Sequence, residues 1–259
     1  MEYPQYLKSE LLARAGFVHA FFTRRGGVSL GPYESLNLSP GVGDATEHVN
    51  ENLRRAAATL GVQTERLYVT RQVHGRDVIV IGGGASAEHV ATLAADANIA
   101  SAMDVACAVR TADCVPVLLA DPFGGRVAAV HAGWRGVASN IVGACVERMS
   151  ALGSQPRDLI AAFGPHISVD AFEVGEDVAA ELERSAGGEG SVKRARDRKP
   201  HVDLAQIVRA QLTLAGLEGS RVERVEGCTF ADRLSFFSHR RDGSTSGRML
   251  SAIVPHGIE

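Results

Sequence analysis

The chain has 259 residues, of which 45% are hydrophobic and 22% are charged, and its formal net charge is -3. This composition is typical of a globular protein with a sizeable core. The slightly acidic charge argues against general binding to nucleic acids or anionic membranes, because such surfaces need an excess of Lys and Arg.

Neither a membrane span nor a secretion signal is predicted. No apolar run approaches the roughly 18 residues that a membrane helix needs, and the first residues, MEYPQYLKSE, lack the basic and apolar regions of a signal peptide. The four cysteines are too few for the disulfide framework of a small secreted protein. We therefore expect a cytoplasmic protein with reduced thiols.

Helical and strand-like patterns alternate irregularly along the chain. The first helix is expected after a cap formed by Asp44 and Glu47, with Gly61 as its end. Further helices are predicted at 141–152, 177–187 and 203–216. Strands are predicted at 77–83, 105–109, 115–121, 126–131, 159–164, 221–227 and 248–254.

The spacing of these strands predicts the fold class. Three strands fall between residues 105 and 131 with short connections, so some of them must pair antiparallel. This order is not a regular βαβ repeat. We predict a single α+β domain over residues 1–259, built of mixed β-sheets with helices packed outside.

Three segments place a metal-binding or nucleophilic side chain at the edge of an apolar segment. They are TRQVHG with His74, TADCVPVLL with Cys114 and VHAGWRG with His131. Two imidazoles and a thiolate are ligands that zinc favours, and three protein ligands leave one tetrahedral position open, as in catalytic sites. Their long spacing does not decide between a metal site and three buried, hydrogen-bonded residues.

The order of the motifs along the chain closely resembles the YfiH-like laccase-domain family, formerly called multicopper polyphenol oxidases. The resemblance covers almost the full chain, and TADC followed by HAGWRG is its most specific part. The matching segments are FFTRRGGVSLGPYESLNLS (21–39), VGD (42–44), QVHG (72–75), TADCVPVLL (111–119), HAGWRG (131–136), FGPHIS…FEVG (163–175), GCT (227–229) and FFSHRRDGSTSGRM (236–249).

The resemblance implies a zinc ion, one per chain, held by His74, Cys114 and His131. It also implies a cytosolic purine nucleoside phosphorylase that uses inorganic phosphate as co-substrate. Such an enzyme acts on adenosine, inosine and S-methyl-5'-thioadenosine and also deaminates adenosine. One departure from the family pattern is GPHIS, where His166 and Ser168 replace small residues. We expect them to alter the pocket rim or to add a polar contact.

The implied reactions suggest roles for other residues. Deamination needs a proton donor and an activated water, whose pKa a zinc ion lowers towards about 7. Asp113 is suited to move the proton or to orient a histidine, although a turn residue is an equal alternative. Phosphate needs cations, for which Arg135 and Arg24 are our candidates, with surface salt bridges as the alternative. Asn37 is a candidate contact to the base or ribose, and otherwise a turn residue.

Four other functions are alternatives to this one. In a cysteine hydrolase, Cys114 would be the nucleophile and His131 its base. Editing of peptidoglycan precursors is associated with some family members. A non-catalytic nucleotide-binding module would need Trp134 and Arg135 but not the three ligands. A multicopper oxidase is disfavoured, because the chain has nine histidines and no His-x-His pair.

Overall fold

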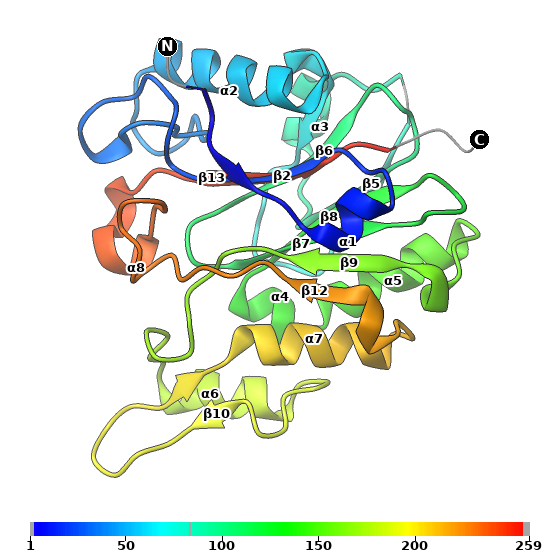
Figure 1. The fold of residues 1–259 in the computed structure, drawn as a ribbon. Helices are drawn as coiled ribbons and strands as arrows, with labels where there is room; N and C mark the ends of the chain where they lie inside the picture. Colours follow the sequence, from blue (N-terminus) through cyan, green and yellow to red (C-terminus); the bar gives the residue numbers. More distant parts are fainter. Residues whose placement is uncertain (1–2, 83, 256–259) are drawn as a thin grey trace.

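Two mixed β-sheets lie face to face, with helices on both outer faces, in the computed structural model of the chain (Figure 1). The structure describes residues 3–82 and 84–255. Sheet 1 has the order β1 (Tyr6–Leu7), β2 (His19–Phe22), β13 (Met249–Ile253), β6 (Ala106–Thr111) and β3 (Leu67–Val69). Sheet 2 has the order β12 (Val222–Arg224), β9 (Ile160–Phe163), β7 (Val115–Ala120), β8 (Val127–Ala132), β5 (Ala97–Ala100) and β4 (Val78–Ile81).

The helices complete the layers. Helix α2 (Thr46–Leu60) covers sheet 1, and α4 (Trp134–Ala138), α5 (Ile141–Ala151) and α7 (Leu204–Leu214) cover sheet 2 (Figure 1). The remaining elements are α1 (Glu10–Arg14), α3 (Ala87–Thr92), α6 (Glu176–Arg184), α8 (His239–Asp242) and the strand pair β10 (Val192–Lys193) and β11 (His201–Val202). None of the described helices has the length and apolar character needed to cross a membrane.

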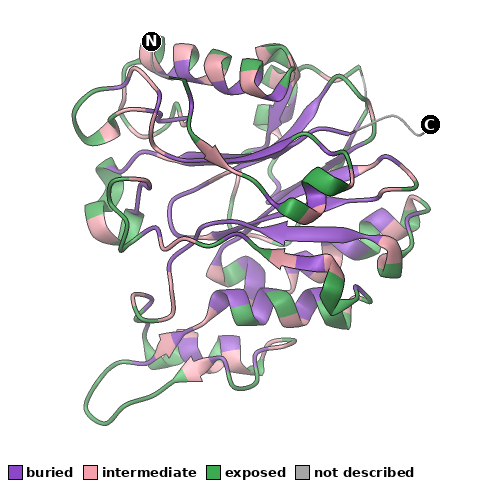
Figure 2. Ribbon diagram, viewed as in Figure 1, coloured by how far each residue is buried: buried purple, intermediate pink, exposed green. Residues whose placement is uncertain are grey.

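Alternating side chains on each strand build three apolar layers, which appear as the buried strands of Figure 2. On β7, Val117 and Leu119 pack against the helices, whereas Leu118 faces sheet 1. On β8, Val130 packs against the helices and Ala129 faces sheet 1. This period of two is the one that the sequence shows, because each strand of a buried sheet supplies side chains to both neighbouring layers.

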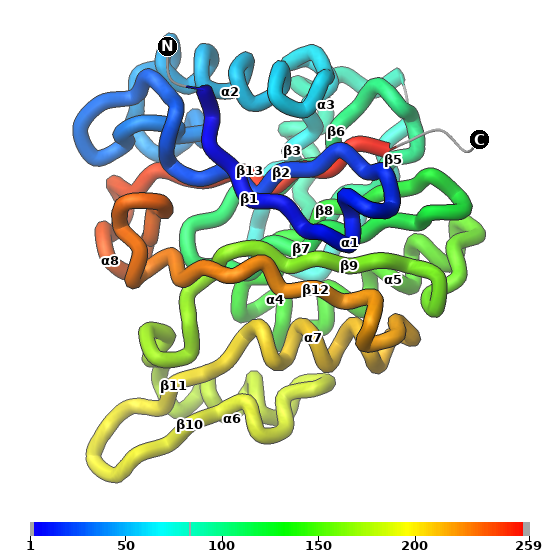
Figure 3. Tube along the Cα trace, in the orientation of Figure 1, coloured from blue at the N-terminus to red at the C-terminus, as the bar shows by residue number. Residues whose placement is uncertain are grey.

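The prediction of an α+β fold with mixed sheets is confirmed, and each predicted strand is present. Both sheets contain parallel and antiparallel pairs. Strands from the first and the last part of the chain pair in sheet 1, where β13 lies beside β2 (Figure 3). The sequence did not predict the short strands β2, β3 and β5, which contain only three or four residues each.

The predicted cap of the first helix is wrong in one respect. Helix α2 begins after Ala45, and no side chain caps it. The carboxylate of Asp44 is used instead to accept hydrogen bonds from Ser29 Oγ at 2.6 Å and Asn37 Nδ2 at 2.9 Å. The end of the helix is as predicted, because Gly61 adopts a left-handed conformation with φ 73°.

A buried asparagine on α2 forms hydrogen bonds to residues between 28 and 37. Asn52 is fully buried, and its Oδ1 accepts a hydrogen bond from Val28 N at 2.9 Å. Its Nδ2 donates to Ser29 Oγ at 2.8 Å and to the carbonyl of Asn37 at 2.9 Å. One side chain therefore sets the position of the segment that leads to residues 37–39.

We expect Asn52→Ala to lower the free energy of unfolding by about 3 kcal/mol, because it leaves several buried polar groups without partners. Urea denaturation measures this change. The matched control is Asn50→Ala, an exposed asparagine on the same helix, which should change stability by no more than about 0.5 kcal/mol. Equal effects of the two substitutions would contradict the structural role of Asn52.

Candidate metal centre

The fold brings His74, Cys114 and His131 together. Their ligand atoms lie within 4.8 Å of one another, and the two imidazole rings are 4.7 Å apart between centroids at an interplanar angle of 85°. His131 is buried, Cys114 is partly buried and His74 is exposed. Three donors that are far apart in the sequence thus form one cluster with an accessible side.

Strand geometry explains how Cys114 and His131 meet. Pro116 on β7 pairs with His131 on β8, and Cys114 lies two residues before Pro116. Because side chains alternate along a strand, Cys114 and His131 lie on the same face of sheet 2, the face that carries Leu118 and Ala129. The short connection from β6 to β7 crosses from sheet 1 to sheet 2 and carries Cys114 to this position.

Asp96 holds both histidines of the cluster in place. It is fully buried, and its Oδ1 lies 2.7 Å from Nδ1 of His131. The same carboxylate accepts hydrogen bonds from the backbone N–H groups of His74 at 2.9 Å, Gly75 at 2.7 Å and Val73 at 3.1 Å. Nδ1 of His131 therefore carries the proton, and Nε2 is left as the ligand atom, as in many zinc sites.

The cluster favours a thiolate at Cys114. Burial raises the pKa of this thiol, but the neighbouring His131 and His74 outweigh burial and lower the pKa to about 6. Burial lowers the pKa of His131, whereas the Cys114 thiolate and the Asp96 carboxylate raise it to about 9. A thiolate is the form in which cysteine binds metals and attacks electrophiles.

The donors fit a zinc ion by their chemistry and by their packing. Two imidazole nitrogens and one thiolate sulfur are a set that zinc prefers. Gly133 forms the floor of the cluster, where a Cβ atom would lie 2.9 Å from His74 Cδ2 and 3.2 Å from Cys114 Sγ. Any side chain at this position would therefore push the donors apart.

The cluster opens onto a cavity of about 660 Å³. Its lining includes the three donors and the polar or charged side chains of Gln72, Arg110, His239 and Arg248. Sequence reasoning missed these residues. Arg110 interrupts the apolar strand β6 two residues after Ala108, on a face that is otherwise buried, and this was the available signal.

The contacts of Asp113 support the second of its two predicted roles, that of a turn residue. Its carboxylate accepts hydrogen bonds from Thr229 Oγ1 and from the backbone N–H of Arg240, each at 2.6 Å. Its φ is 101°, in the left-handed region. Asp113 therefore anchors the crossing between the sheets, and the histidine-orienting role belongs to Asp96.

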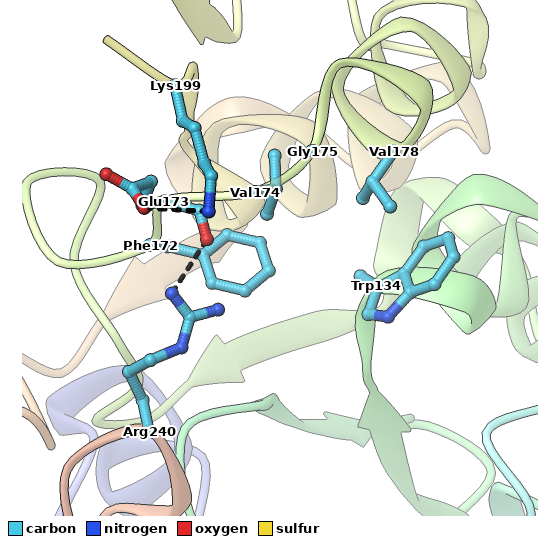
Figure 4. A pocket seen from close by; sticks show the side chains of 8 residues that line it. All are labelled: Trp134, Phe172, Glu173, Val174, Gly175, Val178, Lys199 and Arg240. Carbon is cyan, nitrogen blue, oxygen red and sulfur yellow. Dashed lines mark hydrogen bonds and ion pairs between the residues drawn. The ribbon is translucent and has the colours of Figure 1, made fainter.

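Arg135 does not line the cavity that contains His74, Cys114 and His131. Arg135 is exposed, and its guanidinium stacks 4.4 Å from the centre of the Trp134 ring. Trp134 lines a separate hollow of about 390 Å³ together with Phe172 and Arg240 (Figure 4). In this hollow Arg240 donates to the carbonyl of Glu173 at 2.7 Å. Neither Arg135 nor Trp134 lines the cavity of the cluster, because helix α4 turns away from it after Gly133.

Arg24 is held by main-chain contacts. Its Nε donates to the carbonyl of Glu34 at 2.7 Å and its Nη1 to the carbonyl of Arg233 at 3.1 Å. The guanidinium also stacks 4.4 Å from the Phe237 ring centre. Arg24 thus lines another hollow and does not face the metal cluster.

Asn37 is part of the scaffold and not of the cavity wall. It is fully buried, and its Nδ2 donates to Asp44 Oδ2 at 2.9 Å and to the Ser39 carbonyl at 3.1 Å. Its Oδ1 accepts from the backbone N–H of Arg248 at 3.0 Å. The alternative of a turn-stabilising asparagine is therefore the better description.

The unusual GPHIS segment does not reach the cavity of the cluster. His166 is buried, and its Nδ1 donates to the Gly164 carbonyl at 2.8 Å. Ser168 contacts Cys228, with Oγ and Sγ 3.2 Å apart. Neither residue lines this cavity, so the expectation that they alter its rim or add a polar contact is wrong for this cavity.

Comparisons with known proteins agree with this fold and cluster. The sequence model of the family described as multi-copper polyphenol oxidoreductase laccase matches residues 18–256. The protein named purine nucleoside phosphorylase YfiH from Shigella flexneri is 38% identical over 231 residues, which cover 89% of this chain and 90% of that protein. The protein named adenosine deaminase RL5, from an unknown prokaryotic organism, is 35% identical over 244 residues. This match covers 91% of this chain and 93% of that protein.

A solved structure shows the same fold. The crystal structure of the Bacillus licheniformis hypothetical protein YfiH superposes with a TM-score of 0.91 at 27% sequence identity. The match covers 99% of this chain and 97% of that chain. The resemblance to YfiH-like proteins that the motifs predicted is confirmed.

We expect Asp96→Asn to weaken zinc binding by about 10- to 100-fold, because it removes the acceptor that orients His131 and the 73–75 turn. Competition with a chromophoric chelator measures this affinity. Asp77→Asn is the matched control, because Asp77 is an exposed aspartate of the same loop region. Equal zinc affinity in wild type and Asp96→Asn would show that Asp96 does not support the cluster.

Proposed function

This chain belongs to the multi-copper polyphenol oxidoreductase laccase family, and from this premise we propose its function. We propose that the protein is a zinc-dependent purine nucleoside phosphorylase of the cytoplasm. Its substrates are adenosine, inosine and S-methyl-5'-thioadenosine with inorganic phosphate, and it also deaminates adenosine to inosine. The names of its relatives, purine nucleoside phosphorylase and adenosine deaminase, support both activities.

One observation carries this proposal: the cluster of His74, Cys114 and His131 opens onto a cavity of about 660 Å³. A cavity of this size accommodates a small organic ligand such as a nucleoside. His74, Cys114 and His131 would hold the zinc ion. Zinc at such a site supplies Lewis acidity and lowers the pKa of bound water towards about 7.

Phosphorolysis sets two demands on the residues of the cavity. An oxygen of phosphate forms a bond to C1' of the ribose while the bond from C1' to N9 breaks, and the purine leaves with the electron pair and takes up a proton. The cavity must therefore bind an anion next to the sugar and supply a proton to the base. Deamination also needs proton transfer, since water adds at C6 and ammonia leaves.

His239 is the residue we assign to proton transfer, in place of Asp113. It lines the cavity, and its Nδ1 donates to the Gly243 carbonyl at 2.9 Å. Nε2 then has no partner among the described residues and is left for the substrate. An imidazole is suited to this task because its ring nitrogens can both donate and accept a proton.

A cysteine hydrolase is the second candidate, and one observation favours it. Cys114, His131 and Asp96 form a chain of thiol, imidazole and carboxylate, in which Asp96 lies 2.7 Å from His131. This order is the one found in cysteine nucleophile sites. Zinc bound to Cys114 would leave no free thiolate, so metal content separates the two functions.

We expect the zinc-loaded protein to convert inosine and phosphate to hypoxanthine and ribose 1-phosphate. Cys114→Ser should reduce this turnover at least about 100-fold, because an alcohol is a poor zinc ligand at neutral pH. The products are separated by liquid chromatography, and zinc is measured on the same samples.

Cys228→Ser is the control, because Cys228 is partly buried but lies outside the cavity. It should retain wild-type turnover and zinc. Loss of zinc without loss of turnover in Cys114→Ser would contradict a role of the metal. Turnover that does not depend on phosphate, together with rapid alkylation of Cys114, would favour the hydrolase.

A further inference from the structure

Two arginines reach the cavity from sheet 1, Arg110 from β6 and Arg248 from the residue just before β13. Arg110 on β6 pairs with Leu250 on β13, and Arg248 lies two residues before Leu250. The two arginines are therefore diagonal neighbours on one face of the sheet, where such positions are about 7–8 Å apart. Both line the cavity that contains the metal cluster.

Hydrogen bonds to the protein fix the backbone and one part of the guanidinium group of each arginine. The side chain of Gln72 bonds the backbone of Arg110 on both sides, with N–H to Oε1 and Nε2 to carbonyl distances of 2.8 Å. Arg110 Nε donates to the Leu38 carbonyl at 2.7 Å, and Leu38 N donates to the Arg248 carbonyl at 3.0 Å. Arg248 Nη1 donates to the Ser246 and Gly247 carbonyls at 2.6 and 3.0 Å.

The other guanidinium nitrogens of the two arginines have no acceptor among the described residues. Within residues 3–82 and 84–255, Nη1 and Nη2 of Arg110 and Nη2 of Arg248 have no hydrogen-bond partner, and neither arginine forms an ion pair with a carboxylate. These nitrogens can each donate two hydrogen bonds. The preorganised arginines thus present unused donors to the cavity.

The positive charges of the two arginines also favour the binding of an anion. Burial lowers the pKa of Arg110 to about 10 and lowers that of Arg248, but both stay protonated at neutral pH. The negative charges of the nearby Cys114 and Asp113 favour the charged form of Arg248. Two positive charges that line one cavity attract an anion from solution.

We propose that Arg110 and Arg248 form an oxyanion subsite that binds the phosphate co-substrate beside the metal cluster. The planar guanidinium groups match the oxygens of a tetrahedral phosphate. The identity of the anion as co-substrate rests on the proposed function, whereas the anion site itself rests on the two arginines. A phosphoryl group attached to a nucleoside is the other source of the same chemistry.

The test uses Arg110→Gln and Arg248→Gln in the zinc-loaded protein. Isothermal titration calorimetry measures the binding of inorganic phosphate without nucleoside, and steady-state assays with inosine measure KM for phosphate. We expect each substitution to raise the phosphate Kd and KM at least about tenfold, since each removes hydrogen bonds to a charged ligand. Zinc content and KM for inosine should change by less than about twofold.

Two controls keep the result specific. Arg54→Gln removes an exposed arginine of α2 that pairs with Glu51 at 2.8 Å, and it should behave as wild type. Arg110→Lys keeps the charge but not the planar fork, so it should retain part of the phosphate affinity. It also provides a measurement if Arg110→Gln does not fold.

The outcomes separate the subsite from the proposed function. Unchanged phosphate Kd in both glutamine variants, or no phosphate binding to the wild type, would overturn the subsite even if phosphorolysis occurs. Phosphate binding that depends on both arginines, in a protein that does not cleave inosine, would support the subsite and reject the proposed function. Arginine-dependent binding of inosine 5'-monophosphate but not of free phosphate would reject the co-substrate assignment.

Discussion

The structure of the cluster depends on one buried carboxylate, that of Asp96. This side chain is fully buried and accepts four hydrogen bonds, one from the imidazole of His131 and three from the backbone of residues 73–75. A buried charge is costly unless its hydrogen bonds are satisfied, and here each bond also fixes a part of the cluster. Asp96 therefore joins the two histidine-bearing segments, although neither is near it in the sequence.

The cavity combines contributions from both sheets. Cys114 and His131 come from sheet 2, whereas Arg110 and Arg248 come from sheet 1. The connection from β6 to β7 links the two groups, because it starts just after Arg110 and ends at Cys114. The order along the chain thus places three side chains suited to bind a metal and a pair of cations within one cavity.

The sequence predicted the fold class and most strands because alternating apolar residues are a local signal. It also identified His74, Cys114 and His131, although the spacing alone left their meeting undecided. Asp96 was missed because its segment, AADANIA, has no motif and its partners are distant in sequence. Arg24, Arg135 and Asn37 were candidate substrate contacts because of their glycine-rich or polar neighbours, with a surface salt bridge or a turn as the alternative. Their side chains instead contact main-chain carbonyls, an aromatic ring or the scaffold, and such tertiary contacts leave no local pattern.

Zinc-edge X-ray absorption spectroscopy tests whether His74, Cys114 and His131 hold zinc, because it reports which atoms surround the ion. We expect one zinc per chain, with one sulfur neighbour at about 2.3 Å and two imidazole nitrogens at about 2.0–2.1 Å. The sulfur signal should disappear in Cys114→Ser and persist in Cys228→Ser. A zinc shell of nitrogen and oxygen only in the wild-type protein would contradict the account.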